Sequence, residues 1–227
     1  MLEQQWTTAP PHRAFWLTFT IAAGVLAALA AGVLTADVLG HYGLARADPH
    51  VTAWVVAHRA GWLTDILRVV TWLGSLAVVI PVAVLAGIFF VVRGHRWWPV
   101  ALLAVTIAGA VGLYHLVKYL VGRPRPPPAI WIGHFSGASF PSGHAVQSVA
   151  CYATLALIVA AGRPPRVKIA VGSVAALVVL VVGFSRIYLA AHWLTDVLGG
   201  YALGVAWLAI VIIVMPLVAA SRDTTRR

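Results

Sequence analysis

The stretch VVTWLGSLAVVIPVAVLAGIFFVV, residues 69–92, contains no charged side chain and lies between Arg68 and Arg93. A helix needs about 20 apolar residues to cross the hydrocarbon core of a bilayer, within a range of about 17–25. A backbone in lipid must also satisfy its own hydrogen bonds, which a helix does. The stretch therefore predicts a membrane-spanning helix and sets the interpretation of the whole chain.

Composition supports the same interpretation for the rest of the sequence. Of the 227 residues, 61% are hydrophobic and only 10% are charged, whereas soluble domains carry about 25% charged residues. Five further charge-free runs have spanning length, at residues 14–34, 97–117, 144–161, 169–185 and 197–221. We therefore expect an all-α fold, a six-transmembrane-helix bundle that forms a single domain over residues 1–227.

Two segments near the amino terminus leave alternatives open. The first run could instead be a secretory signal, because it contains ALAAG, which is similar to a cleavage site. Residues 51–70, VTAWVVAHRAGWLTDILRVV, mix apolar and polar side chains at helical spacing. That pattern is typical of an interfacial helix, here between spans one and two. A loop that packs over the bundle is the alternative.

Charge indicates the orientation and the class of partner. The net charge of +10 comes from residues that lie between the apolar runs rather than in one basic stripe, so no nucleic-acid partner is expected. With the amino terminus inside, nine Lys and Arg fall on inner segments and seven on outer ones. The positive-inside rule then favours a plasma-membrane protein with both termini in the cytoplasm. The single cysteine, Cys151, excludes an intrachain disulfide.

Three polar islands interrupt the apolar pattern. They are KYLVGRPRP at residues 118–126, PSGH at 141–144 and SRIYLAAHWLTD at 185–196. The connections after spans three and five lie on the same face of the membrane, here the outer face, so the islands can meet. A lysine or arginine at the end of a span often only reaches the headgroups, and PSGH alone could be a turn. The prediction of one site therefore depends on all three islands together.

The side chains of these islands suit a bound phosphate. Lys118, Arg125 and Arg186 supply positive charge, and arginine offers a planar fork that matches phosphate oxygens. Ser142 is expected to cap a helix whose first N–H groups, near Gly143, attract an anion. The islands thus predict an anion site at the outer end of the bundle.

Two histidines add group-transfer chemistry to this site. His192 and Asp196 are four residues apart, which makes them neighbours on one face of a helix. A carboxylate on one ring nitrogen leaves the other free to attack phosphorus, and His144 can protonate the departing oxygen. Arg123 lies outside this pattern and is interpreted as a helix-end or interfacial residue. Residues 129–140, AIWIGHFSGASF, are interpreted as a lipid-facing lid.

The islands resemble the signature of the type 2 phosphatidic acid phosphatase superfamily, which is K-x6-R-P, then P-S-G-H, then S-R-x5-H-x3-D. The family contains vanadium haloperoxidases as well as bacterial membrane lipid phosphatases that act on undecaprenyl diphosphate or phosphatidylglycerol phosphate. Every signature position is matched, by Lys118, Arg125, Pro126, Pro141, Ser142, Gly143, His144, Ser185, Arg186, His192 and Asp196.

The resemblance implies an enzyme that removes a phosphate from a membrane lipid through a phosphohistidine and without a metal or other cofactor. The predicted orientation puts this reaction at the outer face. Polyprenyl diphosphate is the expected substrate, with phosphatidate or phosphatidylglycerol phosphate as alternatives. A haloperoxidase and a non-catalytic lipid or anion transporter are the competing hypotheses, and the oligomeric state stays open. His192 is implied as the nucleophile, Asp196 as the group that orients it, and His144 as the acid and base. The implied phosphate-binding residues are Lys118, Arg125, Ser142, Gly143 and Arg186.

Overall fold

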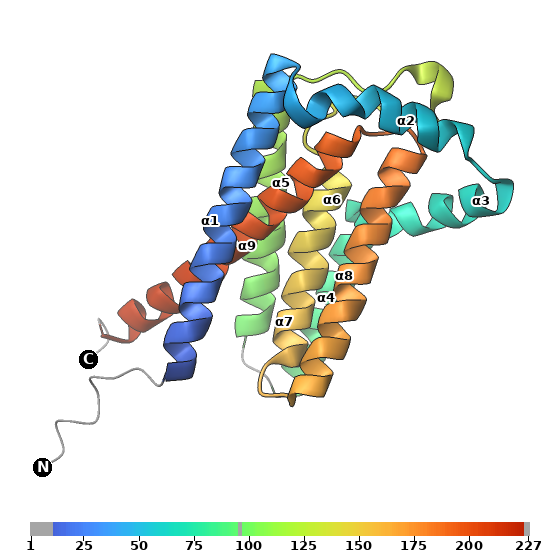
Figure 1. Ribbon diagram of the computed structural model, residues 1–227. Helices are drawn as coiled ribbons and strands as arrows, with labels where there is room; N and C mark the ends of the chain where they lie inside the picture. Colours follow the sequence, from blue (N-terminus) through green and yellow to red (C-terminus); the bar gives the residue numbers. More distant parts are fainter. Residues whose placement is uncertain (1–10, 95–96, 225–227) are drawn as a thin grey trace, which may run out of the picture.

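Helices form all of the regular structure in the described part of the chain. The computed structural model describes residues 11–94 and 97–224, and these ranges contain helices and no β-strand. Five helices there are long and apolar enough to cross a membrane. A sixth span results when the bent pair of α3 (Gly61–Val70) and α4 (Leu76–Val92) is counted as one. The predicted all-α bundle of six spans is confirmed (Figure 1).

The spanning helices begin and end close to the charge-free runs. α5 (Trp98–Val121) has a proline in its first turn and is closed by Gly122, whose φ of 61° is left-handed. Proline suits a first turn because the N–H that it lacks would have no partner there. Glycine suits a left-handed helix end because it has no Cβ to clash. The other long helices are α1 (Pro11–Gly40), α8 (Pro165–Tyr188) and α9 (Leu194–Thr224).

The span that follows the second polar island is built from three helical pieces. They are α6 (Gly143–Ser148), a π-helical turn (Val149–Ala153) and α7 (Thr154–Ala160). Together they form the 18-residue span Gly143–Ala160, half of which is buried inside the protein, more than in any other long span of the described chain. This helix is therefore the centre of the bundle.

Span two begins later than its charge-free run. The chain leaves α3 (Gly61–Val70) through a short 3-10 turn, η2 (Thr71–Gly74), and bends by 55° before α4 (Leu76–Val92). Gly74 lies at the bend, where an added Cβ would come within 2.5 Å of the Val182 side chain. α4 keeps 17 residues, which is the lower limit for a span.

The predicted interfacial helix between spans one and two is divided in two. α2 (Asp48–Ala57) lies across one end of the bundle, and α3 continues from it toward α4 (Figure 1). Arg59, between the two helices, donates from Nε to the backbone oxygen of Tyr188 at 3.0 Å. α3 is amphipathic, because Leu67 is 2% exposed whereas Trp62 is 68% exposed. Both segments are therefore helical, and the alternative of a plain loop is wrong.

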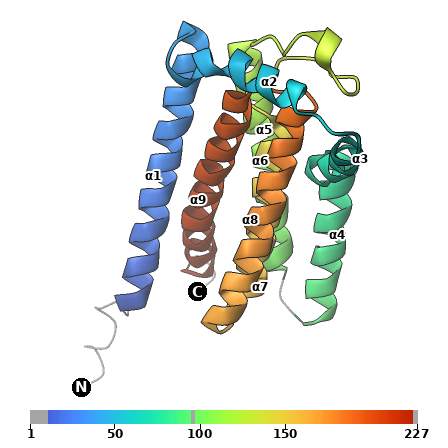
Figure 2. The same cartoon turned by 45° about the vertical axis from the view of Figure 1, so that its right-hand side comes forward.

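The long helices present apolar side chains outward. α1 lies along α9 at one edge of the bundle, and α4 lies at the opposite edge (Figure 2). Leu26 on α1, Val92 on α4 and Ile169 on α8 are each more than two-thirds exposed. Such a continuous apolar surface marks a membrane-facing protein rather than a soluble monomer. Large buried side chains gather instead toward the end that α2 covers, among them Tyr188, Phe140 and Leu189.

α6 and α9 pack closely because α9 carries two glycines at their contact. A Cβ at Gly200 would lie 2.8 Å from both the Ala145 Cβ and the Ser142 carbonyl oxygen. One at Gly204 would lie 2.9 Å from the Val149 Cβ. Protein interiors are close-packed, so neither position accepts a larger residue unless a helix moves. The glycines therefore set the start of α6 against the first turns of α9.

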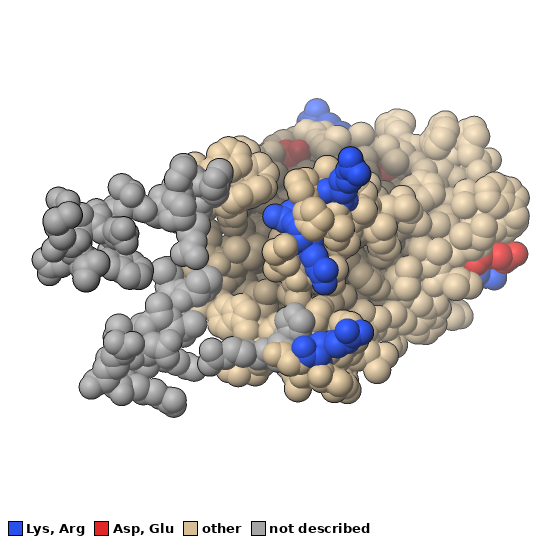
Figure 3. Space-filling model, turned by 90° about the horizontal axis from the view of Figure 1, so that it is seen from below, with Lys and Arg blue, Asp and Glu red and all other residues tan. Residues whose placement is uncertain are grey.

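The end of the bundle away from α2 carries basic side chains. Arg93 closes α4, and Arg163, Arg166 and Lys168 lie between α7 and the first turn of α8, all of them exposed. Figure 3 views this end and shows Lys and Arg side chains across it. Arg96, Arg226 and Arg227, which also enter the predicted orientation, lie outside the described residues.

Candidate active site

The three polar islands meet at the end of the bundle that α2 covers. They surround a cavity of about 660 Å³, formed by the end of α5, the loop that follows it, the start of α6, the end of α8 and the connection to α9. Ser142 and Asp196 are fully buried. The other six predicted site residues line the cavity: Lys118, Arg125, Gly143, His144, Arg186 and His192.

Arg186 is a buried cation with a free donor beside the cavity. Its side chain is 5% exposed, and its Nη1 donates to Thr71 Oγ1 at 2.8 Å. Its Nε has no hydrogen-bond partner among the described residues. A buried donor without a partner is costly, and a phosphate oxygen would satisfy it with a charge-assisted bond. Arg186 is therefore arranged as expected for an anion ligand.

Lys118 and Arg125 donate to the carbonyl oxygens of residues 136–139. Lys118 Nζ donates to the oxygens of Ala138 and Ser139, the latter at 3.2 Å. Arg125 donates to the oxygens of Ser136 at 2.8 Å and Gly137 at 3.0 Å. The two cations thus reach the cavity, as the sequence predicts, but neutral backbone oxygens already hold them in place.

The start of α6 differs in detail from the prediction. Ser142 stands at the N-cap position with an extended backbone, but its side chain makes no capping bond, and its buried Oγ has no partner in the described chain. Gly143 is tightly enclosed, since an added Cβ would lie 3.2 Å from the Tyr114 ring. His144, in the first turn of α6, is partly exposed to the cavity. Ser142 therefore offers an unpaired hydroxyl rather than a helix cap.

The His192 ring is buried and is contacted on both nitrogens. Arg125 Nη1 lies 3.2 Å from Nε2, and Asp196 Oδ2 lies 3.4 Å from Nδ1. A guanidinium only donates, so Nε2 must accept and the ring proton must sit on Nδ1. Burial, together with the positive charges of Arg186, Arg125 and Lys118, holds the pKa of His192 well below its usual range. The ring is therefore neutral at pH 7, with its lone pair on Nε2.

Asp196 reaches His192 in a different way from the one predicted. His192 precedes α9, which begins at Leu194, so the two residues do not share a helical face. They meet because the turn before α9 folds back: Trp193 N donates to Asp196 Oδ2 at 2.8 Å, and His192 N donates to the carbonyl of Arg186 at 3.2 Å. Ser139 Oγ also donates to Asp196 Oδ2. The carboxylate is thereby fixed before it contacts the histidine.

Arg123 is a site residue that the sequence interpretation missed. Its guanidinium lies between two buried carboxylates, with Nη1 2.7 Å from Asp196 Oδ1 and Nη2 2.7 Å from Asp48 Oδ2. The interpretation of Arg123 as an interfacial residue is therefore wrong. Its position two residues before Arg125 was the available signal, but Asp48 lies 75 positions away.

No group of three or more His, Cys, Asp or Glu in the described chain is arranged to hold a metal.

The segment 129–140, predicted as a lipid-facing lid, contacts two of the cations. The Phe135 ring centroid lies 5.0 Å from Arg186 Cζ and 6.0 Å from Arg125 Cζ, within the range of cation–π attraction. Phe135 also packs against the buried cluster that contains Leu189 and Tyr188. The segment therefore helps to position two of the cations.

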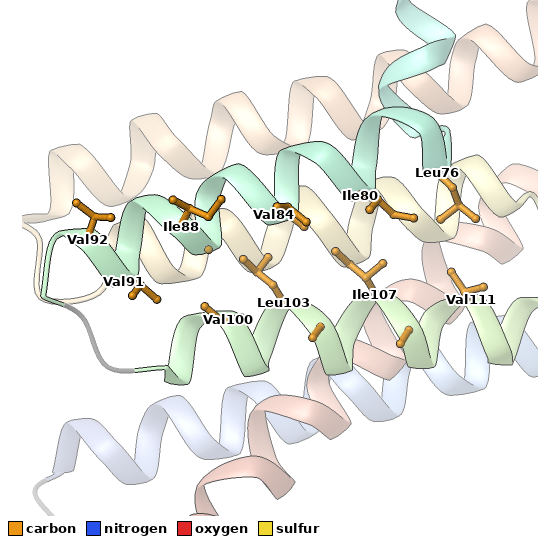
Figure 4. A pocket seen from close by; sticks show the side chains of 14 residues that line it. Leu76, Ile80, Val84, Ile88, Val91, Val92, Val100, Leu103, Ile107 and Val111 are labelled. Atoms are coloured by element: carbon orange, nitrogen blue, oxygen red, sulfur yellow. The ribbon is translucent and has the colours of Figure 1, made fainter.

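An apolar groove of about 750 Å³ lies between α4 and α5. Figure 4 shows its side chains facing one another across the two helices, from Leu76 and Val111 at one end to Val92 and Val100 at the other. Leu76 also lines the polar cavity. The groove and the polar cavity therefore meet at Leu76, and the groove runs from there along α4 and α5.

Comparisons of sequence give a matching family and two related proteins. A family model described as the PAP2 superfamily matches residues 99–219. Phosphatidylglycerophosphatase B of Bacillus subtilis (strain 168) is 32% identical over 162 residues, which cover 70% of this chain and 78% of that protein. Lipid A 1-phosphatase of Rhizobium johnstonii is 32% identical over 122 residues, which cover 50% of this chain and 46% of that protein.

Comparisons of structure agree with those of sequence. The crystal structure of a transmembrane PAP2-type phosphatidylglycerolphosphate phosphatase from Bacillus subtilis superposes with a TM-score of 0.77 at 30% identity, covering 83% of this chain and 94% of that one. Aquifex aeolicus LpxE superposes with a TM-score of 0.60 at 22% identity, covering 76% of this chain and 96% of that one. The second likeness is one of fold.

Proposed function

Because the chain belongs to the PAP2 superfamily, we propose that it is a membrane lipid phosphatase that acts through a phosphohistidine on His192. The observation that carries the proposal is the pair of contacts on that ring. Arg125 faces Nε2 and Asp196 faces Nδ1, so the lone pair of a neutral imidazole lies at the edge of a cavity lined by cations. A nucleophile, an orienting carboxylate and an anion site are the parts of covalent phosphoryl transfer.

The proposed binding step exchanges backbone oxygens for phosphate oxygens. The unpaired Arg186 Nε and the Ser142 hydroxyl offer donors, together with the Gly143 amide. Lys118 and Arg125 would release the carbonyls of residues 136–139 and turn to the phosphate. Charge-assisted bonds are about twice as strong as neutral ones, which favours the exchange. Arg125 would leave Nε2 at the same moment and so free the nucleophile.

The proposed reaction has two steps. In the first, His192 Nε2 bonds to phosphorus while the bond from phosphorus to the leaving oxygen breaks, and His144 gives its proton to that oxygen. In the second, His144 takes a proton from water, the hydroxide bonds to phosphorus, and the P–N bond breaks. Inorganic phosphate leaves, and both histidines return to their starting states. Asp196 stabilises the positive charge that the His192 ring carries while phosphorylated.

Polyprenyl diphosphate is the proposed preferred substrate. Its leaving group is a phosphate, which departs more readily than an alkoxide and asks less of His144. The groove between α4 and α5 suits a long apolar tail, because it runs along α4. That helix is about 25 Å long, close to the thickness of a hydrocarbon core of about 30 Å. Phosphatidylglycerol phosphate is the second candidate, which the Bacillus subtilis relative favours by its name. Either lipid would place its terminal phosphate in the polar cavity and its tail in the groove.

An outward-facing site is also part of the proposal. The basic residues at the other end of the bundle, Arg93, Arg163, Arg166 and Lys168, support a cytoplasmic location for that end. The test replaces Cys151, then introduces a cysteine at position 134 or 165 and adds an impermeant thiol reagent to intact cells. We expect labelling at position 134 and protection at position 165. The reverse pattern would overturn the orientation and leave the chemistry standing.

Phosphate release from purified protein tests the activity itself. A panel of polyprenyl diphosphate, phosphatidylglycerol phosphate and phosphatidate in one detergent is compared by kcat/KM. Activity is expected to persist with a chelator and to be inhibited by vanadate. Lipid transport that survives His192→Ala in reconstituted vesicles would favour a transporter. A tenfold preference for phosphatidate, worth about 1.4 kcal/mol of transition-state discrimination, would refute the polyprenyl assignment alone.

A further inference from the structure

Asp48 is a buried carboxylate outside the three polar islands. It begins α2, in the connection between spans one and two, and is 1% exposed. It accepts hydrogen bonds from the Thr195 backbone N–H at 3.0 Å and from the Thr195 hydroxyl. Asp48 therefore binds the first turn of α9, one residue before Asp196, although it lies far from that turn in the sequence.

Arg123 connects this carboxylate to the one that faces the histidine. The two ends of its guanidinium fork each contact a carboxylate at 2.7 Å, Nη1 with Asp196 and Nη2 with Asp48. Its Cζ lies 5.6 Å from the centroid of the Trp193 ring, and its carbonyl accepts a hydrogen bond from Ser139 N at 2.7 Å. Ser139 in turn donates to Asp196. Both the side chain and the backbone of Arg123 therefore hold the same carboxylate in place.

The charges of this network explain why an arginine stands there. Two buried carboxylates contact one guanidinium, and removal of that guanidinium would leave two like charges in a nonpolar surrounding. Buried carboxylates without a counter-charge take up a proton. A protonated Asp196 would no longer attract the Nδ1 proton of His192, so the ring would lose the tautomer that exposes its lone pair.

We infer that Arg123 and Asp48 are positioning residues for the nucleophile: Arg123 holds Asp196 ionised and turned toward His192, and Asp48 holds Arg123. The inference rests on the proposed function. Arg125, two residues along, faces the cavity, whereas neither Arg123 nor Asp48 is among the described residues that line it. Two arginines of one loop thus have different roles: Arg125 faces the phosphate site, and Arg123 contacts the carboxylates.

Arg123→Gln is the principal test. We expect kcat, and the single-turnover rate of phosphoenzyme formation on ³²P-labelled lipid, to fall about 10- to 100-fold, as when the outer partner of a reactive group is lost. KM should stay within about threefold of wild type, because no phosphate contact is removed. A changed KM with unchanged kcat would overturn the inference.

A double-mutant cycle with Asp48→Asn separates positioning from general stabilisation. Alone, Asp48→Asn should lower kcat by less than about fivefold, because Arg123 still neutralises Asp196. In the Arg123→Gln background it removes one of two unpaired carboxylates, so kcat should recover by about threefold or more. Equal losses from Asp48→Asn in both backgrounds would contradict the proposed role.

Arg59→Gln is the matched control for folding. Arg59 also ties a loop to the same end of the bundle, through the carbonyls of Tyr188 and Ile130, and it should keep kcat while the melting temperature falls. If Arg123→Gln does not fold, Arg123→Lys replaces it, since a lysine keeps the charge but lacks the two-ended fork. A folded Arg123→Lys protein with wild-type kcat would show that one charge holds Asp196 without the fork, and would overturn the role of Asp48.

Failure of the proposed function would look different from failure of this inference. If His192→Ala hydrolyses lipid at the wild-type rate, the phosphohistidine mechanism is wrong, and with it everything that positions His192. If His192→Ala is inactive while Arg123→Gln is fully active, only the positioning role is wrong.

Discussion

The two sides of the polar cavity are held by different kinds of contact. On one side, Lys118 and Arg125 donate to backbone carbonyls of residues 136–139. On the other, His192 and Asp196 are held by buried charges, above all Arg123. A phosphate can displace a neutral carbonyl, but it cannot displace a carboxylate that is already paired with a guanidinium. The comparison teaches that Lys118 and Arg125 can exchange their hydrogen-bond partners when phosphate binds, whereas His192 and Asp196 keep theirs.

The largest effect should come from the side that keeps its partners. His192→Ala removes the proposed nucleophile, and we expect kcat to fall by about 10⁴-fold or more, as for nucleophiles in other covalent mechanisms. The measurement is phosphate release, with gel filtration in detergent to show that the variant is folded. A loss below tenfold would mean that the His192 ring does not attack phosphorus.

His144→Ala tests the proposed general acid, which lies in the first turn of α6 beside the cavity. Loss of a general acid costs about 10²–10⁴-fold, and the cost should depend on the leaving group. We expect a smaller loss on p-nitrophenyl phosphate, whose leaving group needs no proton, than on phosphatidylglycerol phosphate. Equal losses on both substrates would assign His144 to binding rather than to proton transfer.

Arg125→Ala tests the side that exchanges partners. A hydrogen bond to a charged group is worth about 1.5–3 kcal/mol, so kcat/KM should fall about 10- to 100-fold. Water can satisfy the carbonyls of residues 136–139, and only the carbonyl of buried Ala191, 2.6 Å from Arg125 Nη1, loses a donor inside the protein. The melting temperature should therefore fall by less than in Arg123→Gln. A melting temperature lowered as much as in Arg123→Gln would show that both sides are equally structural.

The smallest effect concerns pH. Burial and nearby cations hold the pKa of His192 below its usual range, so the folded ring stays neutral while the unfolded one gains a proton below about pH 6.5. Stability should therefore fall as the pH falls, by about 1.4 kcal/mol per unit from this residue. Denaturant unfolding between pH 7 and pH 5 measures the slope, which should be smaller in His192→Gln. Equal slopes would contradict a neutral buried ring.

Much of the architecture could be predicted because it depends on local patterns. Charge-free runs show where a chain crosses a membrane, and the parity of the spans brings the polar islands to one end. The bend before α4 was not predicted, because residues 69–75 carry no charge and so join the charge-free run of the helix that follows. It arises where Gly74 packs against Val182, a contact between distant parts of the chain.

The candidate site divides in the same way. The residues that line the cavity follow a recognisable spacing, so Lys118, Arg125 and His192 could be named from the sequence. The Arg123–Asp48 pair could not be predicted, because a single charged residue forms no repeating pattern. Its partner also lies in a different loop, between spans one and two. The turn that brings His192 to Asp196 was also missed, since spacing by four suggests a helix wherever it occurs.

The contact of α6 and α9 at Gly200 and Gly204 has a consequence for how such a sequence can change. The distance between the proposed acid on α6 and the nucleophile before α9 is set by two backbones in contact rather than by side chains that can adopt other rotamers. Variation there would alter the chemistry at once. The groove between α4 and α5 is lined by neither histidine, so its exposed side chains, such as Val84, Ile88 and Val92, can vary without moving either ring. Substitutions in the groove can therefore change which lipid tail binds and leave the reaction unchanged. Substitutions at the contact of α6 and α9 would change the distance between the two histidines.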